Sequence, residues 1–286
     1  MARCDVCFHH CEIAEGQKGF CGARTCAGGK VRADNYGRIT GFALDPIEKK
    51  PLRRFHPGSM ILSVGSYGCN LRCPFCQNHE ISWSAEAMAL ADKAETVAPE
   101  ELVRAAVRLR PRGNIGLAFT YNEPLIGWEF VRDTARLAHE AGLVNVLVTN
   151  GTAELPILGE IAPFIDAMNI DLKGFTERYY RHILGGDLDM VKAFIARAAQ
   201  LCHVELTTLI VPGENDSEDE MREMTRWIAE MKDADGKTIG PEIPLHISRF
   251  FPRFHMTDRP PTDVDKVYHL ADVAREKLRF VYTGNC

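Results

Sequence analysis

The sequence contains no run of about 18 uninterrupted apolar residues, the length that a membrane-spanning helix needs. Its opening residues, MARCDVCFHHC, include no apolar stretch of the signal-peptide type. It has no excess of one charge either, because 34 basic residues face 39 acidic ones and the formal charge is −5. This balance excludes a general attraction to nucleic acid or acidic membranes, and no basic stripe with interleaved aromatics is present. We therefore expect a cytoplasmic protein without a membrane or nucleic-acid partner.

Cysteine, by contrast, is abundant and concentrated. Eight of the ten cysteines lie within the first 76 residues. In a reducing cytoplasm, clustered cysteines indicate metal binding or catalysis more often than disulfides. Seven of these form two groups: Cys4, Cys7, Cys11 and Cys21 near the N-terminus, and Cys69, Cys73 and Cys76 in GCNLRCPFCQNHE (68–80). The eighth, Cys26, is spare.

The chain changes its pattern near residue 60. Residues 1–59 are rich in Cys, Gly and Pro without clear periodicity, which is typical of a small metal-stapled segment followed by a linker. From residue 60, short apolar runs alternate with amphipathic helical patterns. Strands are expected at 60–64, 115–120, 144–149, 167–172, 203–211, 244–248 and 280–283, and helices at 99–110, 127–142, 189–201, 217–232 and 262–277.

This alternation predicts parallel βα units of an α/β protein. About 225 residues follow residue 60, fewer than the ~250 of a closed eight-unit barrel. We therefore expect a partial, open (β/α)6 barrel over 60–286, with the Cys-rich segment and linker over 1–59. In such folds the chemistry gathers at the C-terminal ends of the strands.

The three-cysteine loop directly follows the first expected strand of the barrel. A [4Fe–4S] cluster normally takes four thiolates, so three would leave one iron free to bind a small molecule. The alternative is a zinc site with a distant fourth ligand, but zinc sites favour paired C-x₂₋₄-C units at both ends. The spacing of Cys69, Cys73 and Cys76 therefore favours an open cluster.

The spacing C-x₃-C-x₂-C, with Phe75 before the last cysteine, resembles the signature of the radical S-adenosylmethionine (SAM) superfamily. The resemblance implies that SAM chelates the free iron through its amino and carboxylate groups. One electron, supplied by a donor such as flavodoxin or ferredoxin, would then split SAM into methionine and a 5′-deoxyadenosyl radical. The cluster of a radical SAM (β/α)6 barrel would thus be catalytic and carried by these three cysteines.

Four later stretches, each after an expected strand, resemble SAM-binding elements of this superfamily: TYNEP (120–124), VTNG (148–151), DLKG (171–174) and PLHISRF (244–250). By this resemblance, Glu123 would hold the SAM ammonium through a charge-assisted bond. The implied SAM-binding residues are Tyr121, Asn122, Glu123, Asn150, Asp171, Lys173 and His246. Val148 stands where related activases have an aspartate that holds a monovalent cation, so the cation is not expected here.

A narrower resemblance covers almost the whole chain. DPIEKKPL (45–52), FHPGS (55–59), IVPGEND (210–216), HISRFFPRF (246–254) and YTGN (282–285) resemble the AmmeMemoRadiSam-system radical SAM proteins, which are related to pyruvate formate-lyase activating enzymes. The resemblance implies an oxidoreductase that abstracts hydrogen from a substrate, in the manner of an activase that acts on a glycyl residue of a partner protein. It does not supply the identity of the substrate.

The four N-terminal cysteines have the spacing C-x₂-C-x₃-C-x₉-C, and four such thiolates would close a second metal site. The alternative is that these cysteines are reduced and bind no metal. Structural zinc and an auxiliary iron–sulfur cluster both fit, and His9 or His10 could replace one thiolate. A segment so poor in apolar residues could hardly fold without such a staple. Of the remaining cysteines, Cys202 is expected to be buried, and Cys286 to be either a redox thiol on the catalytic face or part of a disordered end.

Two alternatives stay open. The first is a radical SAM enzyme with the same cofactors that modifies a small molecule or RNA. The second is a zinc-binding interaction module without catalysis, which would have no need of polar residues at four strand ends.

Overall fold

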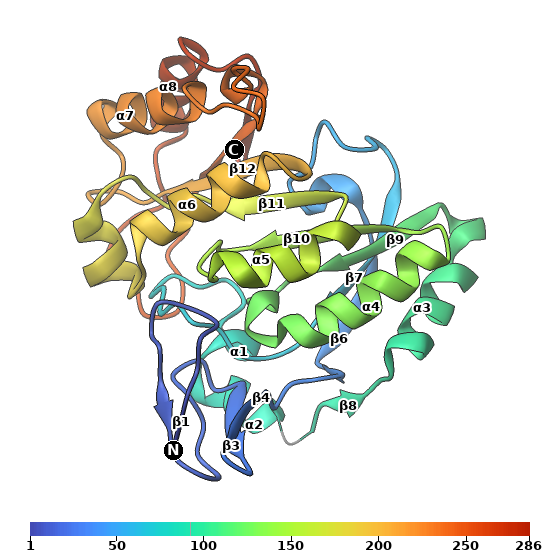
Figure 1. Ribbon diagram of the computed structural model, residues 1–286. Helices are drawn as coiled ribbons and strands as arrows, with labels where there is room; N and C mark the ends of the chain where they lie inside the picture. The colour runs from blue at the N-terminus through green and yellow to red at the C-terminus, as the bar shows by residue number, and fades with distance from the viewer. Residues whose placement is uncertain (92) are drawn as a thin grey trace.

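The computed structural model describes residues 1–91 and 93–286, and its main feature is one curved sheet of eight strands (Figure 1). Seven of these strands are parallel and neighbour one another in chain order. They are β7 (Met60–Gly65), β9 (Asn114–Phe119), β10 (Val144–Thr149), β11 (Ala167–Asp171), β12 (His203–Ile210), β13 (Leu245–Arg249) and β14 (Val281–Gly284). An eighth strand, β6 (Gly41–Pro46), pairs with β7 in the antiparallel direction.

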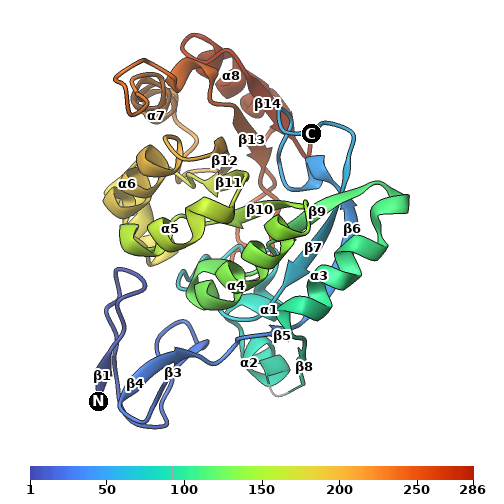
Figure 2. The same cartoon turned by 45° about the vertical axis from the view of Figure 1, so that its right-hand side comes forward.

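Helices connect the parallel strands and cover the outside of the curved sheet (Figures 1 and 2). The covering helices are α3 (Pro99–Arg108), α4 (Trp128–Glu140), α5 (Leu155–Ile161), α6 (Leu188–Ala198), α7 (Glu218–Ala229) and α8 (Val264–Arg275). The two short helices α1 (His79–Ser82) and α2 (Ala85–Ala91) follow the three-cysteine loop instead, and α2 lies beside the N-terminal segment (Figure 1). Local sequence fixes their starts, since Asp187 and Ser217 accept backbone N–H groups at the first turns of α6 and α7. The arrangement confirms the partial (β/α)6 barrel, with six βα units and a last strand.

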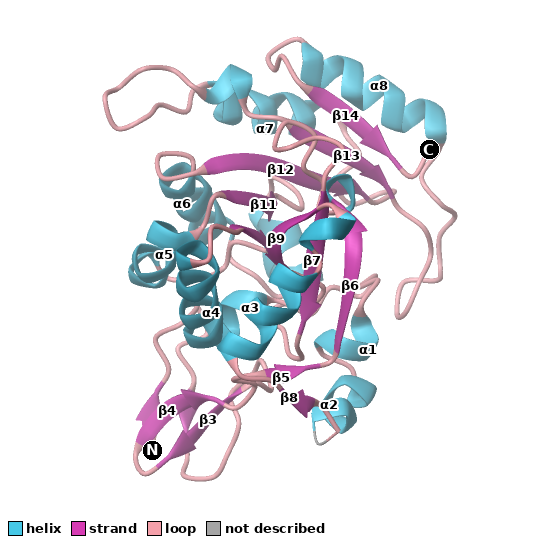
Figure 3. Cartoon of the chain, turned by 90° about the vertical axis from the view of Figure 1, so that its right-hand side faces the viewer, coloured by secondary structure: helices cyan, strands magenta, loops and turns pink. Residues whose placement is uncertain are grey.

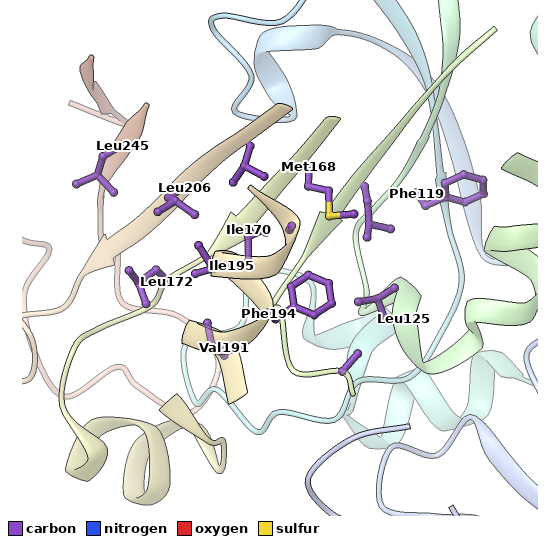
Figure 4. Packing of buried hydrophobic residues seen from close by; sticks show 14 of the residues in the cluster. Phe119, Leu125, Met168, Ile170, Leu172, Val191, Phe194, Ile195, Leu206 and Leu245 are labelled. Atoms are coloured by element: carbon purple, nitrogen blue, oxygen red, sulfur yellow. The ribbon is translucent and has the colours of Figure 1, made fainter. Parts of the chain in front are cut away.

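The main core lies between the sheet and these outer helices. On α6, Val191, Phe194 and Ile195 recur at helical spacing and are fully buried. They face apolar side chains of the neighbouring strands, such as Met168 and Ile170, in Figure 4. Strands covered on both sides are rich in Val, Ile and Leu, as expected for a parallel sheet.

A second, smaller apolar cluster fills part of the inner side of the sheet. It contains Ile47 and Leu52 from the chain before β7, together with Ile61, Ala118, Val146 and Ala167 from the strands. Polar groups secure the same stretch, because Asn169 Nδ2 donates to the Pro51 carbonyl at 2.8 Å. Residues 47–55 therefore close the end of the barrel at which the parallel strands begin.

The residues before β6 form two small two-stranded sheets and one strand of a third, whose other strand comes after β7. β1 (Ala2–Arg3) pairs with β2 (Glu12–Ile13), β3 (Arg24–Ala27) with β4 (Lys30–Ala33), and β5 (Arg38–Ile39) with β8 (Glu95–Thr96). This segment lies beside the loops that follow the parallel strands, as Figure 2 shows. Contacts such as the hydrogen bond from Glu154 N to Val6 O, 3.0 Å, hold it there.

The sheet is open, because β6 and β14 have no strand on their outer sides in the described part of the chain (Figure 3). The sequence did not predict β6, nor the helices α1, α2 and α5. The proposed boundary between residues 59 and 60 stays a prediction, and the pairing of β6 with β7 crosses it. Of the helices that the structure describes, none combines the length and apolar character needed to cross a membrane.

Candidate active site

The three-cysteine loop leaves β7 through Gly68, whose φ of +92° only glycine adopts without strain. Cys73 is buried, while Cys69 and Cys76 are half-buried. Polar hydrogens point at the sulfurs: Leu71 N–H lies 3.4 Å from Cys69 Sγ, Asn150 Nδ2 lies 3.8 Å from it, and the Ser82 hydroxyl bonds to Cys76. Two of the three sulfurs, those of Cys69 and Cys76, thus act as acceptors, which suits thiolate ligands.

Burial raises the pKa of all three thiols. The pKa of Cys73 rises to about 12, and the pKa of Cys69 rises well above its usual value because burial and the Glu123 carboxylate act together. These thiols therefore keep their protons unless a cation binds them, and bound metal deprotonates a thiol outright.

The donor set fits a cluster better than a single ion. In the part of the chain that the structure describes, no three His, Cys, Asp or Glu side chains are placed to hold one metal ion. A zinc ion would need every sulfur about 2.3 Å from one point. In an iron–sulfur cluster each thiolate binds a different iron, so the sulfurs surround a volume.

Glu123 is fixed at the end of β9 by three hydrogen bonds. Its carboxylate accepts from Thr149 Oγ1 at 2.7 Å, Asn150 N at 2.7 Å and Leu125 N at 3.0 Å. Burial outweighs these bonds and raises the pKa of Glu123 to about 7. A carboxylate has about four lone-pair positions, so one remains for a further donor. A bound amino group would fill that position and restore the ionised form.

Asp171 is the last residue of β11 and Lys173 lies just after it. The two form an ion pair, with Lys173 Nζ 2.8 Å from Asp171 Oδ2. Burial alone would lower the pKa of Lys173, but the negative charge of Asp171 and the hydrogen bond to it raise this pKa well above its usual value. The ammonium group therefore stays charged beside the cysteine loop. Glu123, Asn150, Asp171 and Lys173, predicted from separate strand ends, meet around the three cysteines.

Tyr121 and Asn122 use their side chains within the protein. Tyr121 has a positive φ of 76° and donates its hydroxyl to Asp45 Oδ2 at 2.9 Å. Asn122 Nδ2 donates to the carbonyls of Tyr67 and Gly68, both at 3.1 Å. These contacts tie the turn after β9 to the start of the cysteine loop. The predicted contact of either residue with SAM stays a prediction.

His246 lies on the inner side of the sheet, two strands from Asp171. The register Asp171↔Thr207↔His246 puts them in one row, about 9–10 Å apart by the usual strand spacing. Its Nε2 lies 2.6 Å from Oε2 of Glu205, a fully buried residue of β12. Glu205 was not predicted as a site residue, although a carboxylate inside the apolar run HVELTTLIV was a signal for it.

Glu205 joins the strands to the chain that closes the barrel. It accepts from His203 and His246 and from the backbone N–H groups of Arg53 and Arg54. Burial by itself would raise the pKa of Glu205, but these four bonds lower it to about 2.

Replacing Glu205 by glutamine should lower the free energy of unfolding by about 1.5 kcal/mol near pH 7, because charge-assisted bonds to four donors are lost. Because the pKa of Glu205 is lower in the folded protein, its carboxylate stabilises the fold at pH values above its usual pKa of 4.5. This stabilisation is lost as the pH falls towards 2. Urea unfolding at several pH values should therefore show a difference between the two proteins that shrinks below about pH 4.5. Glu242→Gln, at an exposed ion pair, is the control; a difference independent of pH would contradict this account.

The four N-terminal cysteines also come together. Cys4, Cys7, Cys11 and Cys21 line one small cavity, whereas the fifth thiol, that of Cys26, lies outside it, 3.5 Å from Glu15 Oε2. Metal binding there stays a prediction. Of the two remaining cysteines, Cys202 is half-buried, less than expected, and Cys286 is exposed.

Comparison with known proteins agrees with this geometry. Residues 63–228 match the Radical SAM superfamily, and the chain belongs to it. An uncharacterised protein of Methanocaldococcus jannaschii, MJ0808, is 37% identical over 286 residues, or 99% of this chain and 81% of that protein. The pyruvate formate-lyase 1-activating enzyme of Escherichia coli K12 is 25% identical over 57% of this chain and 66% of its own length.

Other relatives share only part of their length with this chain. The GTP 3′,8-cyclase of Pseudomonas putida W619 is 30% identical over 56% of this chain, which spans 46% of the cyclase. Among solved structures, Streptococcus suis SuiB bound to S-adenosylmethionine superposes with a TM-score of 0.58 at 12% identity, over 79% of this chain and 52% of SuiB. This last likeness shows the fold alone.

Proposed function

We propose that this protein is an oxidoreductase that cleaves SAM reductively and uses the product radical to abstract hydrogen from a glycyl residue of a partner protein. The observation that carries the first part is the meeting of the three thiols of the cysteine loop with Glu123, Asn150, Asp171 and Lys173 at neighbouring strand ends. When bound by the three cysteines, a [4Fe–4S] cluster supplies the low-potential electron that splits SAM.

The protein's own residues would bind and orient SAM. Glu123 has one free acceptor position for the SAM amino group, as described above. Lys173, held charged by Asp171, supplies a donor for the methionine carboxylate or the ribose hydroxyls. Asn150 connects Glu123 to the cysteine loop, because its backbone N–H binds the Glu123 carboxylate and its side chain lies near Cys69.

Two observations support a protein substrate. The sheet is open between β6 and β14, so a polypeptide loop could enter from the side. The relatives include pyruvate formate-lyase activating enzymes from E. coli and Clostridium pasteurianum. A small-molecule substrate is the second candidate, because the GTP 3′,8-cyclase shows similarity over 56% of this chain. Membership of the radical SAM superfamily argues against a zinc module without catalysis.

Deuterium transfer distinguishes the two substrate classes. Cells of the source organism are grown on deuterated glycine, and their anaerobic extract is separated by ultrafiltration into proteins and small molecules. Each fraction is incubated with reconstituted protein, SAM and dithionite. Deuterium in the 5′-deoxyadenosine from the protein fraction supports a glycyl substrate. Deuterium in the 5′-deoxyadenosine only from the small-molecule fraction would mean that the substrate is a metabolite and not a protein. Deuterium from neither fraction would contradict a hydrogen derived from glycine.

A further inference from the structure

The cavity between the N-terminal cysteines has the features of a metal–thiolate site. Its four sulfurs come from three different turns of the chain, and each of them is held by a backbone hydrogen bond. The N–H donors are Val6 for Cys4, His9 for Cys7, Phe20 for Cys11 and Ala23 for Cys21. Such bonds orient sulfur ligands and stabilise the thiolate over the thiol.

An unpaired arginine donor is buried in the wall of the same cavity. Arg24 is only 5% exposed, and its two terminal nitrogens bind the Glu129 carboxylate and the Ile126 carbonyl. Its Nε has no partner among the described residues. A buried donor of this kind costs free energy unless something accepts from it. An anionic thiolate-ligated metal centre in the cavity would supply the acceptor.

This cavity is connected to the catalytic loop by hydrogen bonds. The Asn70 side-chain amide bonds to the Cys7 thiol, and Asn70 Oδ1 accepts from Asn150 Nδ2 at 2.9 Å. Asn150 Nδ2 lies in turn 3.8 Å from Cys69 Sγ. Two asparagine side chains thus connect a sulfur of the N-terminal group to a sulfur of the catalytic group.

The two cysteine groups are also packed directly together. A Cβ added at Gly68 would lie 2.8 Å from the Cys21 carbonyl oxygen and 2.7 Å from Ala23 Cβ. The Arg72 guanidinium, between Cys69 and Cys73 in sequence, stacks 3.8 Å from the centre of the Phe20 ring. No solvent layer or intervening element separates the N-terminal segment from the catalytic loop at these contacts.

We infer that Cys4, Cys7, Cys11 and Cys21 hold an iron–sulfur cluster, and that the electron needed at the catalytic loop enters through it. One electron passes from a reduced one-electron donor protein to this cluster and then to the catalytic cluster, with no bond formed and no proton moved. A single zinc ion would need these thiols around one point, and no three such side chains are so placed in the described part of the chain. Zinc also has no redox chemistry and would leave the connection through Asn70 without use. The catalytic cluster, as the electron acceptor, rests on the proposed function, whereas the N-terminal cluster does not.

Metal analysis tests for the N-terminal cluster without an assay of enzyme activity. The variant Cys69→Ala/Cys73→Ala/Cys76→Ala, reconstituted anaerobically with iron and sulfide, should contain about four irons per chain and no stoichiometric zinc. After reduction it should show the electron paramagnetic resonance (EPR) signal of a reduced cluster. One zinc per chain, or no metal in a folded chain, would overturn the inference.

Reduction kinetics test the path. Cys11→Ala removes the least buried ligand, and Cys26→Ala, a fifth cysteine of the segment outside the cavity, is its matched control. Freeze-quenched EPR follows reduction of the catalytic cluster by reduced flavodoxin and by dithionite. In Cys11→Ala the flavodoxin rate should fall by more than an order of magnitude, with the dithionite rate and the Cys26→Ala rates little changed. Equal loss with both reductants, or no loss with either, would overturn the path. This readout needs no SAM cleavage, so it can fail or succeed independently of the proposed function.

Discussion

Replacing Cys73 by alanine should abolish cleavage of SAM to methionine and 5′-deoxyadenosine. Cys73 is buried beside Lys173 and Asp171, and under the proposed function it would supply one of three thiolates to the catalytic cluster. Without it two ligands remain, too few to hold the cluster in the loop. Anaerobic protein with dithionite and SAM, assayed for 5′-deoxyadenosine by chromatography, should show no turnover above that of a protein-free reaction.

The matched control is Cys202→Ala. Cys202 is half-buried just before β12, far from the cysteine loop in the chain, and its thiol donates to the Ala198 carbonyl, 3.8 Å away. This variant should keep full turnover and the full iron content of the wild type. Turnover in Cys73→Ala equal to that of the control would remove the assignment of the catalytic cluster to this loop.

Replacing Glu123 by glutamine should weaken SAM binding about ten- to a hundred-fold, because a charge-assisted hydrogen bond contributes about 1.5–3 kcal/mol. Glutamine keeps the shape of the side chain but cannot carry the negative charge that a bound amino group favours. Equilibrium dialysis of SAM under anaerobic conditions, with the iron content measured in parallel, separates loss of affinity from loss of the cluster.

The Glu123 carboxylate also accepts hydrogen bonds that stabilise the turn after β9. The control must therefore remove one of these bonds and leave the negative charge in place. Thr149→Val removes the 2.7 Å bond from Thr149 Oγ1 to Glu123 Oε1. Its SAM affinity should stay close to that of the wild type. A similar loss in both variants would mean that Glu123 acts through the turn and not through SAM.

The pH dependence gives a further check on Glu123. Its pKa in the ligand-free protein is about 7, so the carboxylate becomes protonated as the pH falls below 7. A protonated carboxyl must release its proton before it can pair with a cation, so wild-type affinity should fall with pH in this range. Both proteins bind the same SAM, so the ratio of their affinities isolates Glu123. A ratio that does not change between pH 6 and pH 8 would contradict the predicted pKa effect.

Most of the barrel could be predicted from the sequence, because its strands and longer helices have local periodic patterns. β10 was predicted with the bounds 144–149 that the structure shows, and α7 and α8 lie within their predicted ranges. β6 was missed because it lies at the edge of the sheet, where Phe42 is exposed and no buried alternation marks the strand. The helices α1 and α2 are short and follow the cysteine loop without a clear amphipathic repeat.

The sequence by itself determined the catalytic loop and the meeting of Glu123, Asn150, Asp171 and Lys173. It could do so because parallel strands all end at one edge of a sheet, so residues that follow successive strands must come together. Only the tertiary structure decided that Tyr121 turns to Asp45, that Glu205 binds His246, and that Asn70 joins Cys7 to the catalytic loop. Each of these contacts joins residues far apart in the chain, and no local spacing or periodicity specifies such a pair before the sheet has curved and the N-terminal segment has packed against it.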